Sequence, residues 1–140
     1  MGLRVGTVLI GLLALPVPAR ADPVFVLGPE AAAANLDLRA LERLLLGISR
    51  VSAHGTSLEL VLPPSHNVAL EKCLSLRFKM SMTTFQKHWI RVTLRGAATP
   101  PRQLEVAGVL QHLKTHPAAV TVLDHEGVPQ SLQMISCEDD

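Results

Sequence analysis

The sequence predicts an α/β fold in three layers, a mixed sheet flanked by helices. Two observations support this prediction. Short apolar runs at 24–27, 58–62 and 119–123 are typical of strands, and four segments between or beside them carry apolar residues at helical spacing. Strands that alternate with helices are typical of layered α/β domains. No repeat, charge block or low-complexity linker divides 22–140, so we expect a single domain there.

Residues 1–21 are predicted to be a signal peptide. Arg4 supplies the positive start, an apolar stretch of about eight residues follows, and Ala19-Arg20-Ala21 fits the cleavage rule. This stretch is far shorter than the roughly 20 residues that cross a bilayer. We therefore expect export to the periplasm, cleavage after Ala21, and a soluble protein without a membrane anchor.

The composition argues against a nucleic-acid partner. The chain has 13 Lys and Arg residues against 12 Asp and Glu, and loss of Arg4 and Arg20 leaves 11 against 12. The basic residues are dispersed along the sequence, and only four Phe or Trp residues are present to stack on bases.

The first half of the chain predicts a strand, a helix and a second strand. Val24–Leu27 is a β-branched and aromatic run, and the Pro-Glu-Ala stretch after Gly28 indicates a loop or a weak helical turn. Asp37 is placed to cap a helix that Gly47 ends. The apolar face of that helix consists of Leu38, Leu41, Leu44 and Leu45. The run 58–62 alternates as a strand and ends at Pro63-Pro64.

The second half predicts three more helices and two strands. Ser65 or Asn67 can cap the next helix, and a break at Ser81 opens another, which Gly96 closes. Phe85, Trp89 and Val92 lie at i, i+4, i+7 of this second helix, which predicts that Trp89 belongs to the core. Thr99-Pro100-Pro101 is expected to be a loop. The remaining elements are a helix through 106–113, a strand at 119–123 and a last strand at 132–135.

The order of these landmarks resembles one lobe of the phosphate-type periplasmic substrate-binding proteins. The likeness covers about 85 residues, from LDLRALERLLLG through LVLPPSHN and FQKHWIRVTLRG to HPAAVTVL. The matching positions are Asp37, Gly47, Gly55, Ser65, Phe85, Trp89, Gly96, Pro100 and Pro117.

The resemblance implies a site for phosphate or another small oxyanion at Ser65, His66 and Asn67. Members of this family hold the anion with hydroxyls, an Arg and helix N-terminal N–H groups, which lack partners within the helix. Here Ser65 matches the family's serine. Val61 stands where the family has its Arg, and His66-Asn67 replaces Gly-Thr, so any binding should be weak and should rely on a protonated His66.

Two functions therefore remain open. The first is a single-lobe solute-binding or sensing module that works with a membrane permease, a sensor or another envelope protein. The second is a structural or interaction protein of the envelope on the same fold, in which Ser65-His66-Asn67 only caps a helix.

No catalytic pattern is present, so we expect neither an enzyme nor a cofactor. His112 and His116 lie at i, i+4, but the first lacks the neighbouring Glu of zinc proteases, so no metal is expected there. Cys73 and Cys137 are the only cysteines. In an oxidising compartment they either form a disulfide or remain a buried thiol and a loose one.

Overall fold

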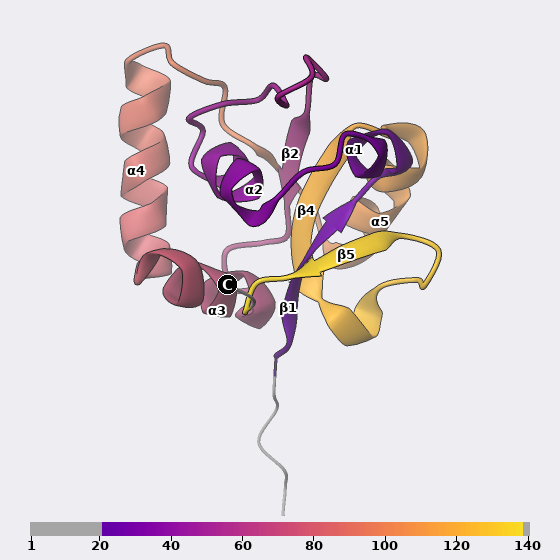
Figure 1. The fold of residues 1–140 in the computed structure, drawn as a ribbon. Coiled ribbons are helices and arrows are strands. Elements are labelled where there is room, and N and C mark those ends of the chain that lie inside the picture. The colour runs from indigo at the N-terminus through magenta and orange to yellow at the C-terminus, as the bar shows by residue number, and fades with distance from the viewer. Residues whose placement is uncertain (1–20, 139–140) are drawn as a thin grey trace, which may run out of the picture.

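The computed structural model describes residues 21–138, and Figure 1 shows their arrangement. The predicted signal peptide lies outside the described residues, Ala21 excepted. Within the described part, no helix is long and apolar enough to span a membrane.

The strands are β1 (Pro23–Leu27), β2 (Glu59–Leu62), β3 (Arg102–Gln103), β4 (Ala119–Asp124) and β5 (Gln133–Ser136). The helices are α1 (Pro29–Ala33), α2 (Leu38–Leu45), α3 (Val68–Phe78), α4 (Met82–Leu94) and α5 (Val106–Thr115), with a short 3₁₀ turn, η2, at His125–Gly127.

The strands form one mixed sheet in the order β3-β2-β4-β1-β5. β2 runs parallel to β3 and β4, whereas β1 runs antiparallel to both β4 and β5. Phe25 pairs with Val122 at the centre of the sheet. The predicted fold class, a mixed sheet flanked by helices, is confirmed.

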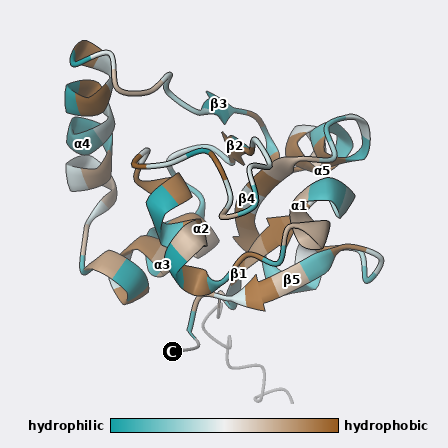
Figure 2. Cartoon of the chain, turned by 45° about the horizontal axis from the view of Figure 1, so that its top comes forward, coloured by the Kyte–Doolittle hydropathy of each residue, from teal (hydrophilic) through white to brown (hydrophobic). Residues whose placement is uncertain are grey.

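Hydrophobic side chains leave the sheet on both faces. Alternation along β1 sends Phe25 and Leu27 to one face and Val24 and Val26 to the other, and all four are buried. The first face packs against α2, α3 and α4, which form the larger core. The second packs against α5 through Val109 and Leu113, and Figure 2 shows that the central strands are mostly hydrophobic.

The predicted helix boundaries are confirmed at three helices by their caps. The Asp37 carboxylate accepts a hydrogen bond from the Ala40 N–H (2.8 Å), and the Ser81 hydroxyl accepts one from the Thr84 N–H (3.1 Å). Asn67, rather than Ser65, caps α3, with its side-chain oxygen 3.0 Å from the Leu70 nitrogen. These bonds satisfy N–H groups that have no partner within the helix.

Trp89 is buried, as predicted, and it determines how α2 and α4 pack. Its side chain is 8% exposed, and its indole N–H donates to the Leu45 carbonyl at 3.1 Å. Gly47 ends α2 with φ of +73°, and a Cβ there would approach the Trp89 ring to 2.7 Å. Glycine is therefore required at position 47 both for its left-handed conformation and for the close approach of the ring.

The stretch after Gly28, predicted as a loop or a weak helical turn, forms the five-residue helix α1. One element was not predicted from the sequence. Arg102 and Gln103 follow the predicted proline loop and form β3, where Arg102 pairs with Val61. Strand β3 has two exposed residues, so it carries no apolar periodicity that would have predicted it.

The structure joins Cys73 of α3 to Cys137 in a disulfide, with a Cα–Cα distance of 5.6 Å. Both cysteines are fully buried. Arg77, also on α3, donates to the Cys137 carbonyl (3.2 Å) and pairs with Glu42 (3.3 Å). The end of the described chain is thus fixed against α3.

Candidate functional site

The structure places the predicted oxyanion residues in the loop between β2 and α3. Ser65 is half-buried, His66 is exposed, and Asn67 is half-buried. Because the Asn67 side chain bonds the Leu70 N–H, its amide oxygen already has a structural task. This arrangement accounts for Asn67 through helix capping alone.

The surroundings of Val61, in β2 before this loop, explain why no Arg occupies this position to bind an anion. The side chain is fully buried and belongs to the core beneath α5, together with Val109 and Leu113. An Arg at this position would have to place its guanidinium among apolar side chains, which is costly without a paired charge. Position 61 therefore serves the core.

A second candidate site, which the sequence did not indicate, is an apolar groove along α4. The groove has a volume of about 480 Å³. One wall is α4, and the other is the segment Pro100–Gln103, which leads into and includes β3. The lining residues are Leu62, Met82, Phe85, Gln86, Trp89, Ile90, Thr93, Leu94, Pro100, Pro101 and Gln103.

The groove exists because apolar side chains extend around more of the α4 surface than α2 and the sheet bury. Phe85, Trp89 and Val92 are buried against α2 and the sheet. Ile90, the residue after Trp89, remains 59% exposed, and Leu94, five residues after Trp89, remains 81% exposed. In Figure 1, α4 stands at the edge of the molecule, beside α2 and α3, which leaves its outer side open.

Three cations lie beside the exposed apolar ridge that Ile90 and Leu94 form on α4. Lys87, Arg91 and Arg95 follow one another at i, i+4, i+8, which places them on one side of α4. All three are exposed, and within residues 21–138 none forms a side-chain hydrogen bond or ion pair. The sequence contains no Asp or Glu between Glu71 and Glu105, so no acidic residue of α4 offsets this charge.

Three of the basic residues that are dispersed along the sequence are therefore aligned on this helix. Their regular four-residue spacing, next to Ile90 and Leu94, was the signal that could have predicted this basic amphipathic surface.

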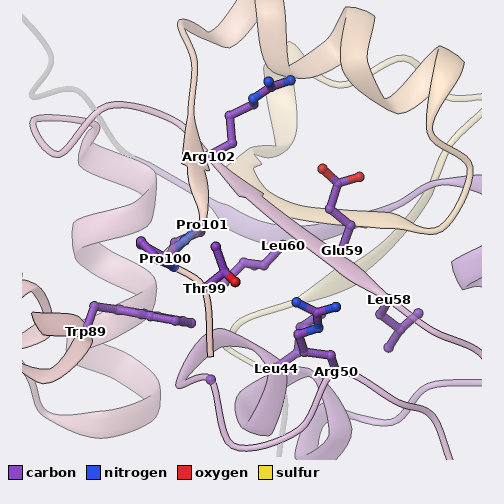
Figure 3. A pocket seen from close by; sticks show the side chains of 11 residues that line it. Leu44, Arg50, Leu58, Glu59, Leu60, Trp89, Thr99, Pro100, Pro101 and Arg102 are labelled. Atoms are coloured by element: carbon purple, nitrogen blue, oxygen red, sulfur yellow. The ribbon is translucent and has the colours of Figure 1, made fainter. Parts of the chain in front are cut away.

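A smaller pocket of about 260 Å³ adjoins the groove and shares Trp89, Pro100 and Pro101 with it. In Figure 3, Arg50 reaches into this pocket between Thr99 and Leu58. Within the described residues, the Arg50 side chain also has no hydrogen-bonding or ionic partner. Arg50 and Arg102 thus lie near the groove, although Glu59 lines the same pocket.

A third candidate site is a group of polar residues on the face of the sheet opposite the core that packs against α4. The ligand atoms of Glu59, His112 and His116 lie within 4.8 Å of one another. The His112 Nε2 is 2.9 Å from the Glu59 carboxylate, although 53 residues separate them in the sequence. These are side chains of the types that hold a divalent transition metal.

No protein-family model matches the chain, and no curated protein matches it significantly.

Proposed function

We propose that the protein is an interaction module of the cell envelope that binds an acidic amphipathic segment of a partner protein in the α4 groove. Together with the export predicted from residues 1–21, this corresponds to the interaction-protein alternative raised by the sequence. The observation that carries the proposal is an open apolar groove along α4, together with the three exposed cations Lys87, Arg91 and Arg95 on the side of α4 next to Leu94. The disulfide supports an oxidising compartment, where such bonds persist.

The apolar lining gives the groove its affinity. Ile90 and Leu94 leave aliphatic surface in contact with water, and contiguous apolar patches on a soluble domain typically mark interaction sites. Trp89 forms part of the lining, and buried aromatic residues often dominate the binding energy of an interface.

The charges select the partner. Lys87, Arg91 and Arg95 would attract an acidic segment and disfavour a basic one, because like charges across an interface are costly. The concave shape favours a helix that inserts apolar side chains between α4 and the Pro100–Gln103 wall. A flat membrane surface would not fill such a groove.

The test uses a designed acidic helix about four turns long, with Leu on one face and Glu on the other. Trp89 is the only tryptophan in the chain and lines the groove, so its fluorescence reports binding directly. We expect saturable binding that weakens as salt is added. Ile90→Glu should weaken it at least about tenfold, since it removes apolar contact and repels the peptide.

Matched variants separate this surface from general effects. Ile48 is 58% exposed, much like Ile90, but it does not line the groove, so Ile48→Glu should leave binding unchanged. Reversal of Lys87 and Arg91 to Glu should weaken binding about tenfold, whereas Lys114→Glu on α5 should not. If Ile90→Glu and Ile48→Glu bound alike, or if anionic vesicles bound and the peptide did not, the proposal would be wrong.

Weak oxyanion binding at Ser65, His66 and Asn67 is the second candidate. One observation favours it: the half-buried Ser65 hydroxyl, in the loop just before α3, has no hydrogen-bond partner within the described residues. Phosphate titrated calorimetrically should then bind, and His66→Ala should weaken the binding, because the imidazole is the side chain next to Ser65 that can donate a hydrogen bond in place of the missing Arg. The absence of heat would eliminate this candidate.

A further inference from the structure

We infer that Glu59, His112 and His116 form a binding site for a divalent transition metal of the zinc class. This site lies on the α5 face of the sheet, opposite the core that packs against α4, and is independent of the proposed groove function. Each residue offers one ligand atom, and the three atoms lie within 4.8 Å of one another.

The fold brings the three side chains together for identifiable reasons. Side chains alternate along β2, so Glu59 points to the same face as Val61, the face that α5 covers. Figure 3 shows Glu59 extending away from Leu60 and Trp89. His112 lies on α5, and His116, four residues later, caps its end, so the two rings lie on adjacent turns.

The two histidine rings lie close enough to reach a single ion, which both would coordinate once the rings rotate out of their parallel stack. They stack with centroids 3.7 Å apart and planes 5° from parallel. The His112 side chain is only 6% exposed, and its Nε2 already lies 2.9 Å from a Glu59 oxygen. A metal ion that took the place of the shared proton would contact both groups with small side-chain rotations.

The second ring is held by neighbours in the way that metal ligands typically are. The His116 Nδ1 is 2.9 Å from the Thr115 hydroxyl and 3.2 Å from the His112 carbonyl. A ring that donates through Nδ1 to a backbone carbonyl keeps its lone pair on Nε2, and this outer contact is usual for metal-binding histidines. Within the described residues, the His116 Nε2 has no hydrogen-bond partner.

An ordinary ion pair accounts for only part of this arrangement. It explains the contact between His112 and Glu59, but not why a third ligand atom, from His116, lies within 4.8 Å of both. A metal site uses all three side chains, one of them buried, one half-buried and one exposed to solvent.

The ligand types restrict the metal. Two imidazole nitrogens and one carboxylate oxygen suit zinc and its transition-metal neighbours, whereas calcium and magnesium take oxygen ligands. Three protein ligands also leave a position for water or for a group from outside the chain.

The test is calorimetric titration of Zn²⁺ into the purified protein without a histidine tag. Wild type should bind one equivalent. His116→Ala and Glu59→Gln should each weaken binding at least about tenfold, the lower end of what is lost when even a supporting group is removed. Co²⁺ absorption should give visible bands in wild type that both variants lose.

His54→Ala is the matched control, because His54 is exposed and lies outside the cluster. It should bind Zn²⁺ like wild type. His116→Ala loses the stacking on His112, so the melting temperature of the metal-free variant is measured as well, to exclude unfolding as the cause. If wild type bound no Zn²⁺, or if His116→Ala and His54→Ala bound it equally, the inference would be overturned.

Discussion

Replacement of Trp89 by Ala should lower the free energy of unfolding by about 3–5 kcal/mol, as large aromatic truncations in cores do. The indole fills the space between α2 and α4, with Gly47 directly against its ring. Its removal also leaves the Leu45 carbonyl without the N–H donor that now lies 3.1 Å away. Urea unfolding followed by circular dichroism measures the loss, since the fluorescent residue is gone.

Ile90→Ala is the control for this prediction, because Ile90 is the next residue of the same helix and is 59% exposed. It should cost less than about 1 kcal/mol, since little of its side chain leaves water on folding. If Trp89→Ala unfolded at the urea concentration of wild type, the packing of α4 described above would be wrong.

The second large effect is expected from removal of the disulfide. Cys73 and Cys137 are 64 residues apart, and a closed loop of this length restricts the unfolded chain enough to contribute about 4 kcal/mol on the chain-entropy account. We expect a protein with both cysteines changed to Ala to lose a free energy of that size. Denaturant unfolding of the two proteins side by side measures it.

Reduction of wild type provides an independent check. With dithiothreitol, wild type should unfold at nearly the denaturant concentration of the double variant, while the variant itself should not respond. If oxidised and reduced wild type unfolded together, the two cysteines would not be paired in solution.

Local signals predicted most of the elements, because each was decided by a few neighbouring residues. Asp37, Ser81 and Gly47 are capping and terminating residues whose roles depend on the backbone beside them. The capping residue of α3 was left open between Ser65 and Asn67, since both types cap helices. The strand order, and the pairing of Arg102 with Val61, depend on contacts between distant segments, which no local pattern specifies.

The candidate sites were harder to predict for the same reason. The spacing on α4 identifies Trp89 as core, but how far the core extends toward Ile90 depends on what α2 and the sheet cover. Likewise, His112 and His116 are visible as a pair in the sequence, whereas Glu59 joins them only because α5 packs over β2. The spacing of Lys87, Arg91 and Arg95 is visible in the sequence. It indicates an interaction surface only once the neighbouring Ile90 and Leu94 are known to be exposed.

The most direct test of the proposed function is to map the binding surface by ¹H–¹⁵N NMR during titration with the acidic helix. We expect shifts at the Trp89 indole N–H and at the amides of Ile90, Thr93 and Leu94, with little change at residues 65–70. Shifts confined to the start of α3, or no shifts along α4 at saturating peptide, would contradict the proposed function.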